Sequence, residues 1–436
     1  MLYNQIASCT ITFVVMIANE DLIPKSQATI VDIWPSSSSL DRRQVSMKVA
    51  QRVQYFTESV IREMTRLANR HGAINLGQGM PDFDPPELVK EAACAAIRDG
   101  ANQYAITWGA PALRTAIAAK AQAFNGIECD PEAEITVCCG ATECMMATMM
   151  ALVDPGDEVI IFQPFYENYG PDALLTGAKA VWVPLHPPNW QFDPQELRNA
   201  FSPRTKAIIV NTPNNPTGRV FTRDELTIIA ELCQEFDAFA LADEIYEYIR
   251  FVDAPHISIA TLPGMAERTV TISGLSKTYS MTGWRLGYCI APPAVTDGIR
   301  KAHDFLTVGA PHPLQVAGAA ALALPQSYYD GLRRDYHRRR DLLLGYLKEA
   351  GFAFHAPEGA YYVMTDIAGL DPSRDGATFV RWMIENIGVS AVPGGSFYSP
   401  RERGRTQVRF MFAKRDATLQ QAGERLLGIR ERLANS

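Results

Sequence analysis

Between about residues 88 and 324, the hydrophobic positions of the chain alternate between helical spacing and short, continuous apolar runs. The seven runs are residues 135–138, 158–162, 180–184, 207–211, 239–243, 269–273 and 287–290. Strands that helices cover on both faces read as continuous apolar runs, whereas half-exposed strands alternate. The pattern therefore predicts an α/β domain with a doubly wound, mostly parallel sheet. Ligands of such sheets bind beyond the carboxyl ends of the strands, and we expect a site there.

The pattern changes after residue 325. A long helical stretch is followed by a Gly-rich hairpin region at 356–363 and by a closing helix whose apolar residues recur at spacings of three and four. This predicts a smaller α+β domain over residues 326–436, after a large domain over residues 87–325.

The chain before the large domain falls into two segments. Residues 47–86 contain a helix and an extended arm, which we expect to pack with the smaller domain. Residues 1–46 hold a short apolar stretch and a run of four serines, and we expect a disordered extension. No basic region precedes the apolar stretch and no clear cleavage site follows it, so secretion is the minor alternative.

Composition narrows the class of protein. The chain has 436 residues, 47% hydrophobic and 20% charged, which suits a globular protein with two cores. A net charge of −7 argues against a nucleic-acid surface, and the apolar stretch near the N-terminus is too short to span a membrane. The eight cysteines lack paired spacing, so we expect reduced thiols and a cytoplasmic protein. The seven histidines lack metal-ligand spacing, so we predict no metal site.

The most informative segment is residues 273–288, SGLSKTYSMTGWRLGY, where Lys277 and Arg285 lie eight positions apart around a Gly-containing turn. A lysine ε-amine readily forms a Schiff base with a carbonyl, and the planar fork of an arginine suits a doubly charged phosphate. Together they indicate a cofactor with an aldehyde and a phosphate, and pyridoxal phosphate has both. The segment, which begins at Ser273, is very similar to the cofactor-binding signature of the class I and II aminotransferases.

A second element is Gly140-Ala141-Thr142, which follows an apolar run and opens an Ala- and Met-rich helix. Free backbone N–H groups, the helix dipole and the Thr142 hydroxyl would converge there on an anion such as a phosphate. Many strand-to-helix turns carry the same residues for capping alone. Taken by itself, this element favours capping.

Two further elements follow apolar runs. Asn215 lies in the turn Asn-Pro-Thr-Gly, which proline and glycine hold in a fixed conformation, although a plain turn would read the same. Asp243 ends a run and is followed by Tyr246. A carboxylate at the end of a buried strand needs a positive partner, and a protonated pyridine nitrogen would be one. The alternative is an aspartate that caps the next helix.

Near the C-terminus, Arg409 lies inside an aromatic and apolar strand, QVRFMF. Arginine is seldom buried without an anion. The resemblance to the aminotransferases places the substrate carboxylate here, and the fork of donors of an arginine matches a carboxylate. The alternative is an ion pair with a carboxylate of the protein itself.

The resemblance to class I and II aminotransferases extends from about residue 47 to the end, with the motifs in the family's order. It is strongest to the branch with the kynurenine, glutamine–phenylpyruvate, methionine and prokaryotic aspartate transaminases. It implies the α/β fold of fold type I pyridoxal-phosphate-dependent transferases. It also implies that Asn215 and Tyr246 contact the ring oxygen and that Arg409 binds the substrate carboxylate together with Asn215 and the Gly79 backbone. By the same resemblance Tyr166 stacks on the cofactor ring.

The resemblance further implies that Tyr104 reaches the phosphate of a neighbouring subunit, which predicts a homodimer with shared active sites. A packed aromatic would read the same. The other partners that we expect are an amino acid and a 2-oxo acid, with no nucleic acid and no membrane.

The implied activity is transfer of the amino group of an L-amino acid to a 2-oxo acid by ping-pong kinetics, with Lys277 as proton carrier. Thr142 stands where some aspartate enzymes of this branch carry a lysine. The expected substrate side of the site is aromatic or apolar, with Met80, Tyr104, Trp108 and Tyr166. We therefore expect a neutral or aromatic donor. The alternatives are an aspartate aminotransferase and a C–S or β-lyase on the same fold. A cofactor-sensing regulator of transcription would need a DNA-binding module, and we expect residues 1–46 to be too short to form one.

Overall fold

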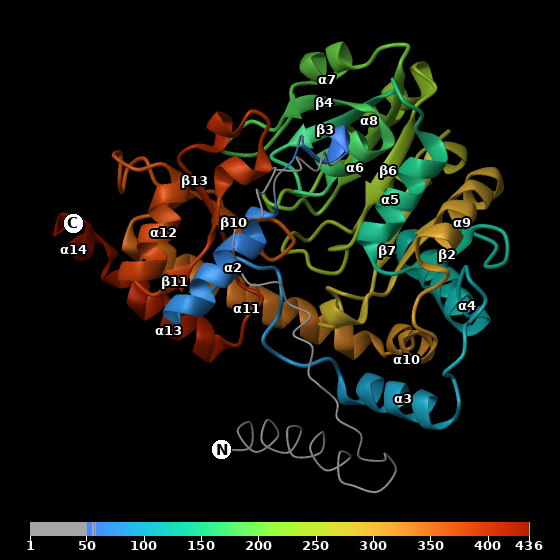
Figure 1. Cartoon of the computed structure of the whole chain (residues 1–436), viewed down its shortest axis with the longest axis horizontal. Helices are drawn as coiled ribbons and strands as arrows, with labels where there is room; N and C mark the ends of the chain where they lie inside the picture. Colours follow the sequence, from blue (N-terminus) through green and yellow to red (C-terminus); the bar gives the residue numbers. More distant parts are fainter. Residues whose placement is uncertain (1–49, 55, 57, 436) are drawn as a thin grey trace, which may run out of the picture. The chain divides into compact units, whose positions relative to one another are not determined.

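All seven apolar runs form strands of one sheet in the computed structural model (Figure 1). The strands are β2 (Ile135–Cys138), β3 (Glu158–Gln163), β4 (Lys179–Pro184), β5 (Thr205–Asn211), β6 (Phe239–Asp243), β7 (Thr269–Gly274) and β8 (Gly287–Ile290). Their order is β2-β8-β7-β6-β5-β3-β4. Only β8 runs antiparallel to its neighbours, β2 and β7. The predicted mostly parallel sheet is confirmed.

The structure describes residues 50–54, 56 and 58–435. The extension that we predict at residues 1–46 lies outside the described residues. None of the described helices is both long and apolar enough to cross a membrane.

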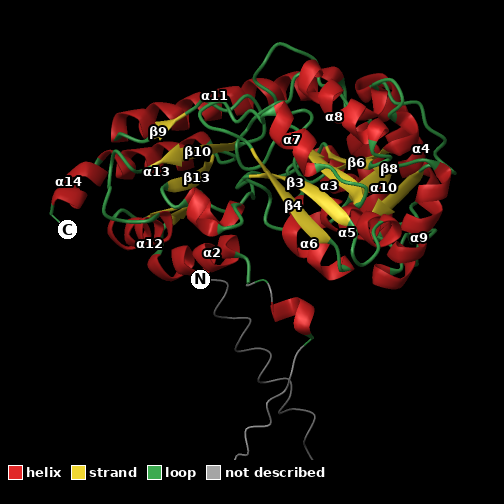
Figure 2. Ribbon diagram, turned by 90° about the horizontal axis from the view of Figure 1, so that it is seen from above, coloured by secondary structure: helices red, strands yellow, loops and turns green. Residues whose placement is uncertain are grey.

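Helices cover both faces of the seven-stranded sheet, as continuous apolar strands require (Figure 2). One face packs against α5 (Ala141–Leu152), α6 (Tyr169–Thr176) and α9 (Pro293–Thr307). The other packs against α7 (Pro194–Ala200) and α8 (Arg223–Glu235). Alternate residues of β3 divide between the two faces, with Ile161 on the first and Ile160 on the second.

A third core lies at the β2–β8 end of the sheet. It is built by α3 (Glu87–Arg98), α4 (Pro111–Lys120) and α10 (His312–Leu322), and a short π-helical segment, η2 (Ala121–Asn125), continues α4. The 25-residue helix α11 (Gln326–Ala350) then leads into the C-terminal part and ends at Gly351, whose left-handed φ of 99° suits glycine.

The C-terminal part contains a four-stranded antiparallel sheet in the order β12-β13-β10-β9. The strands are β9 (Ala353–Phe354), β10 (Tyr362–Asp366), β12 (Val392–Pro393) and β13 (Gln407–Met411). Its helices are α12 (Gly376–Asn386), α13 (Asp416–Leu427) and α14 (Ile429–Ala434). The predicted closing helix is thus two helices, because α13 ends at Gly428. The predicted domain boundaries at residues 86 and 325 stay predictions.

The arm before the large sheet packs with this C-terminal part. Helix α2 (Val60–His71) contacts α12, and β1 (Ile74–Asn75) pairs in parallel with β11 (Val389–Ser390). The chain then continues from β1 toward the carboxyl ends of the large-sheet strands.

Parallel register brings the chemistry-bearing turns to one edge of the large sheet. Asn211 pairs with Asp243, and Asp243 pairs with Ile272, so β5, β6 and β7 end side by side. The turns after these strands carry Asn215, Tyr246 and Lys277. The sheet therefore sets the position of the candidate site.

Candidate active site

Asp243 is the last residue of β6 and is buried. Its Oδ2 accepts a hydrogen bond of 2.6 Å from the Tyr169 hydroxyl, and its Oδ1 accepts one of 3.2 Å from the Ile245 N–H. Burial raises the pKa of this carboxyl, although the two hydrogen bonds and the nearby Lys277 oppose the shift. No cation among the described residues forms an ion pair with Asp243. A cationic ring nitrogen would supply the missing charge.

Lys277 lies in the turn after β7. Its Nζ donates a long hydrogen bond of 3.4 Å to the Gly79 carbonyl and lies 5.9 and 5.7 Å from the ring centroids of Tyr246 and Tyr361. Burial lowers the pKa of this amine, and the positive charges of Arg285 and Arg409 lower it further. A lowered pKa favours the neutral form of the amine, which is the form that acts as a nucleophile and a base.

The start of α5 and Arg285 form a cradle for an anion. The N–H groups of Ala141 and Thr142 precede the first intrahelical hydrogen bonds, which begin at Glu143. Arg285 has a left-handed φ of 55°, and its Nη2 lies 3.5 Å from the Cys139 carbonyl. A Cβ at Gly140 would lie 2.4 Å from that Nη2, so only glycine lets the guanidinium approach the helix.

Asn215 and Arg409 meet between the two sheets. Arg409 lies on β13 and is fully buried, and its Nη1 donates to Asn215 Oδ1 at 2.7 Å while its Nη2 donates to the Gly77 carbonyl at 2.9 Å. Its Cζ lies 4.0 Å from the ring centroid of Tyr362 and 4.7 Å from that of Phe397.

Arg409 has no carboxylate partner within the part of the chain that the structure describes, and its Nε is buried without a hydrogen-bond partner there. The alternative of an ion pair with a protein carboxylate is therefore not what the geometry favours. A buried guanidinium with an unused donor fits a carboxylate brought by a ligand.

Tyrosines surround the amine of Lys277. The Tyr246 hydroxyl donates to the Tyr362 hydroxyl at 3.2 Å, and the Tyr361 hydroxyl donates to the Gly79 carbonyl at 3.0 Å. A Cβ at Gly79 would lie 2.0 Å from the Tyr362 hydroxyl, so glycine is required for this close approach.

Tyr166 lies beyond the end of β3, in edge-to-face contact with Tyr169 at 5.7 Å between ring centroids. Burial raises its pKa to about 12, although a hydrogen bond with the Thr142 hydroxyl lowers it. Tyr166 thus lies between the anion cradle and the residues around Asp243.

Two predicted site residues lie apart from this group. Ser273, expected to contact the cofactor, is buried and donates its hydroxyl to Glu247 Oε1 at 2.8 Å, so this prediction is corrected. The reason is that successive strand residues point to opposite faces, and the Ser273 side chain points to a separate polar cluster. Tyr104 is 83% exposed and does not join the site of its own chain.

That separate group, the back cluster, consists of Lys120, Asn125, Glu244, Glu247 and His256. Lys120 Nζ lies 2.5 Å from Glu247 Oε1, Asn125 Nδ2 donates to both glutamates, and His256 Nε2 lies 2.8 Å from Glu244 Oε2. All five residues are buried. Although burial raises the pKa of Glu247, the charges of Lys120 and His256 outweigh it and the net pKa is lowered.

Ligand-type side chains come within 4.8 Å of one another in three groups among the described residues. They are Cys138, Cys144 and Cys289; Cys138, Glu143 and His303; and Glu244, Glu247 and His256. The members of the first two groups come from separate elements, which residue spacing in the sequence does not detect. In the last group Lys120 already supplies the positive charge. The expectation of no metal site stays a prediction.

Sequence reasoning missed Tyr169, Tyr361, Tyr362 and the Gly77 carbonyl. Tyr169 lies one helical turn after Tyr166, and the tyrosine pair follows Gly359 at the start of a buried strand. An aromatic pair in that position was the available signal for Tyr361 and Tyr362. The contact of Tyr169 with Asp243 depends on tertiary packing and left no signal in the sequence.

The residues present fit pyridoxal phosphate. The α5 cradle with Arg285 suits a phosphate, the amine of Lys277, whose pKa burial lowers, suits an aldehyde, and the buried Asp243 suits a cationic ring nitrogen. Each of these features needs a ligand to complete it. The phosphate, the aldehyde and the ring nitrogen that would do so are all parts of pyridoxal phosphate.

Comparisons with known proteins agree with this chemistry. The sequence profile of the family described as "Aminotransferase class I and II" matches residues 71–426. The chain is 40% identical to the probable N-succinyldiaminopimelate aminotransferase DapC of Mycobacterium tuberculosis, with 88% of this chain and 99% of the relative covered. The three-dimensional structure of N-succinyldiaminopimelate aminotransferase from that organism is similar to this one with a TM-score of 0.84, and the match covers 88% of this chain and 100% of that chain.

Two other relatives are of similar closeness. The chain is 38% identical to the methionine aminotransferase of Escherichia coli, with 84% of this chain and 95% of the relative covered. It is also 38% identical to human kynurenine–oxoglutarate transaminase 1, with 84% and 94% covered.

Proposed function

The chain belongs to the class I and II aminotransferase family and is a pyridoxal-phosphate-dependent aminotransferase, and we propose that its amino donor is a neutral or aromatic L-amino acid. The enzyme transfers the amino group of an L-amino acid to a 2-oxo acid. We propose the roles of the individual residues from the geometry described above.

Lys277 is the proposed catalytic lysine. When bound, the cofactor supplies an electrophilic aldehyde and a ring that withdraws electrons from the substrate α-carbon. The Lys277 amine, whose pKa burial lowers, takes the proton from that carbon as a base and returns it as an acid. Its position beside the Gly79 carbonyl and between two tyrosine rings supports this role.

Asp243 is the proposed partner of the ring nitrogen. The Tyr169 hydroxyl and the Ile245 N–H orient its carboxylate, and the charge holds a proton on the ring nitrogen. Asn215 and Tyr246 are the proposed partners of the ring oxygen. These contacts support the electron-withdrawing state of the ring.

Ala141, Thr142 and Arg285 are the proposed phosphate ligands, through two backbone N–H groups, a hydroxyl and a guanidinium. Tyr166, next to Thr142, is the proposed aromatic that covers the ring. Ser273 is not part of this set, because its hydroxyl is engaged with Glu247.

Arg409 is the proposed grip on the substrate α-carboxylate, together with Asn215 and the Gly79 backbone. The single observation that carries the proposed function is this fully buried guanidinium, which no carboxylate of the described residues neutralises. Binding of a carboxylate there would orient the α-carbon toward Lys277.

The proposed class of amino donor follows from the side chains that line the rest of the site around Lys277. Besides Asp243, Arg285 and Arg409, whose roles are assigned above, the side chains near Lys277 are Tyr246, Tyr361 and Tyr362, which offer rings and hydroxyls rather than charge. Methionine and kynurenine transaminases among the relatives support a neutral or aromatic donor. The ring of Trp108 is contacted instead by guanidiniums, with the Cζ atoms of Arg300 and Arg114 at 5.0 and 6.0 Å from its centroid.

We also propose a homodimer, in which Tyr104 reaches the phosphate of a second copy. Tyr104 and Phe305 are 83% and 92% exposed, and the Gln103 carbonyl lies 3.1 Å from the His312 ring nitrogen, which brings the Tyr104 loop beside the start of α10. Large exposed aromatic side chains of this kind suit a contact between copies. A cytoplasmic location is proposed as well, on the free thiols of the described cysteines.

The test is the absorption spectrum of the purified holoenzyme with a panel of L-amino acids, alongside Lys277→Ala. We expect the visible band of the cofactor to shift with neutral or aromatic donors, with one 2-oxo acid formed per site, and Lys277→Ala to lose at least about 10³-fold in rate. Formation of pyruvate and ammonia would indicate a lyase instead. A response to aspartate alone would contradict the proposed donor class.

A further inference from the structure

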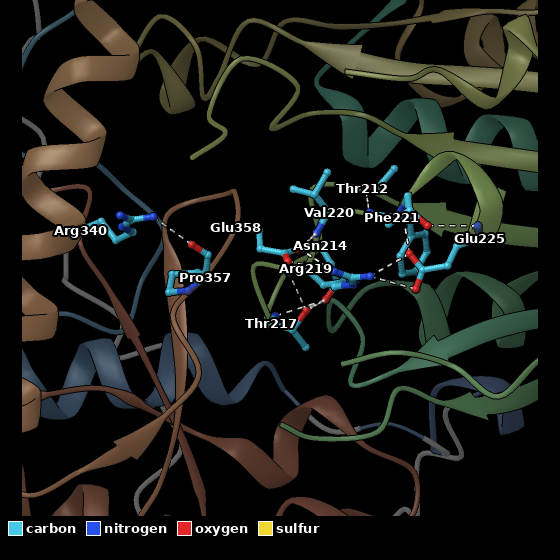
Figure 3. Close-up of polar contacts among 11 residues, drawn as sticks. Thr212, Asn214, Thr217, Arg219, Val220, Phe221, Glu225, Arg340, Pro357 and Glu358 are labelled. Atoms are coloured by element: carbon cyan, nitrogen blue, oxygen red, sulfur yellow. Dashed lines mark hydrogen bonds and ion pairs between the residues drawn. The ribbon is translucent and has the colours of Figure 1, made fainter. Parts of the chain in front are cut away.

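Arg219 follows the Asn-Pro-Thr-Gly turn directly, and its side chain is 8% exposed. Its Nη1 donates to both carboxylate oxygens of Glu358, at 2.9 and 2.8 Å, and its Nη2 donates to both of Glu225, at 3.1 and 2.9 Å (Figure 3). One guanidinium thus forms a bidentate contact on each side. Such a fork fixes orientation as well as distance.

The two carboxylates belong to different parts of the molecule. Glu225 forms the capping box of α8 with Thr222, which holds it against the large sheet. Glu358 lies in the turn that leads into β10 of the four-stranded sheet, and its Oε2 also accepts a hydrogen bond of 3.0 Å from the Val220 N–H. Arg219 therefore links a fixed helix start to the other sheet.

Backbone contacts tighten the same junction. The Gly218 carbonyl accepts hydrogen bonds from the N–H groups of Glu358 and Gly359, at 2.9 and 2.8 Å. A Cβ at Gly218 would lie 2.3 Å from the Pro357 Cβ, so the turns touch closely. The loop is also closed on itself, because the Asn214 N–H donates to the Arg219 carbonyl at 2.8 Å.

Both ends of this junction lead to the proposed carboxylate grip. Asn215 lies in the turn before Arg219, and β10 begins with Tyr362, whose ring stacks 4.0 Å from Arg409. Arg409 pairs with Met364 of β10 and donates to Asn215. The distance between Asn215 and Arg409 is thus set by their hydrogen bond and, on the other side, by Arg219.

We propose that Arg219, with Glu358, is a positioning residue that holds Asn215 and Arg409 at the separation that binds the substrate α-carboxylate. A buried ion network adds little net stability compared with apolar packing, so its contribution here is geometric. This inference rests on the assignment of Asn215 and Arg409 to that carboxylate proposed above.

The experiment measures the Kd of an unreactive carboxylate, 3-phenylpropionate, for the holoenzyme from the change in cofactor absorbance, together with KM and kcat. The variants are Glu358→Gln, Arg219→Lys and Arg409→Gln. The side chain of Glu358 is 28% exposed, and glutamine can still form hydrogen bonds there, so we expect Glu358→Gln to fold. This variant keeps the test valid if Arg219→Lys does not fold. The matched control is Glu235→Gln, which breaks the exposed Arg198–Glu235 pair within the large-sheet helices.

We expect Glu358→Gln and Arg219→Lys to raise the Kd and the KM about 10-fold while kcat changes less than about twofold. Combining Arg219→Lys with Glu358→Gln should weaken binding no more than the stronger single change does, since both break one contact. Cofactor affinity and the control should stay unchanged.

A lower melting temperature with an unchanged Kd in Glu358→Gln would overturn the proposal and leave Arg219 a purely structural residue. Arg409→Gln distinguishes a failure of the proposed carboxylate grip from a failure of the proposed role of Arg219. If it leaves the Kd unchanged, the proposed carboxylate grip fails and this inference fails with it. If it weakens binding while Glu358→Gln does not, only the role of Arg219 fails.

Discussion

Two groups of buried charged side chains lie on opposite sides of the short turn at residues 243–247, and they differ in how well they are satisfied. On the site side, Asp243 has two hydrogen bonds and no cation partner among the described residues, and Lys277 has one long hydrogen bond. On the back side, Glu247 contacts an ammonium, an amide and a hydroxyl.

The pKa directions express the same difference. Burial raises the pKa of Asp243 and lowers that of Lys277, so both groups move toward the neutral form. In the back cluster the charges of Lys120 and His256 overcome burial and lower the pKa of Glu247. A buried charge that other residues neutralise, such as Glu247, contributes to structure. Buried ionisable groups without such partners, such as Asp243 and Lys277, indicate a binding site for a ligand.

The largest effect that sharpens this comparison is expected from Lys120→Met. Removing the ammonium leaves Glu247 buried without its ion-pair partner, which should lower the free energy of unfolding by about 3–5 kcal/mol. Urea unfolding of the holoenzyme would measure this. The kcat of the folded fraction should stay within about twofold, since Lys120 does not contact the site. A large loss of kcat with unchanged stability would break the distinction.

Asp243→Asn should give the opposite result. The amide keeps the shape but loses the charge that holds a proton on the ring nitrogen, so kcat should fall about 10²–10³-fold. The free energy of unfolding of the cofactor-free protein should not fall, because a buried, unpaired carboxylate has been removed. Steady-state kinetics and urea unfolding of the same preparation would check both. A stability loss with retained kcat would contradict the assignment.

A smaller effect is expected from Asp172, which challenges the comparison because it is buried yet lies outside the proposed site. Within the described chain its Oδ2 has no hydrogen-bond partner, and burial raises its pKa to about 7. The folded protein then binds a proton that the unfolded chain, with a value near 3.8, has already released. Stability should therefore fall as pH rises from about 4 to about 7.

Asp172→Asn removes this dependence. We expect the variant to be more stable than the parent by roughly 4 kcal/mol at pH 8 and by little at pH 4. Unfolding midpoints at the two pH values would test this, with Asp237→Asn as a control at a position whose side chain is 95% exposed. Equal differences at both pH values would show that Asp172 has an unseen partner.

The sequence predicted the features that depend on neighbouring residues. All seven strands were found because continuous apolar runs reflect burial on both faces, and the turns with Lys277, Asn215 and Asp243 were found because each follows such a run. Parallel strands then bring those turns to one edge.

Other features depend on packing between distant segments and left no signal. Tyr169 reaches Asp243 from another element, and Arg219 meets Glu358 across 139 positions. Ser273 was assigned wrongly because its side of the strand cannot be read from a motif. A single closing helix was expected because the apolar spacing continues across Gly428. The structure instead ends α13 and begins α14 at this glycine.

The close approach of Arg285 to Gly140 also bears on how this sequence can vary. A side chain at position 140 would collide with the guanidinium, and Arg285 itself occupies a backbone conformation that few residues adopt. The dependence runs one way: a side chain at position 140 must displace the Arg285 guanidinium, and it is strained in any case because Gly140 has a φ of 88°. In a library of random variants, glycine should therefore persist at position 140 even in lineages that lose the arginine.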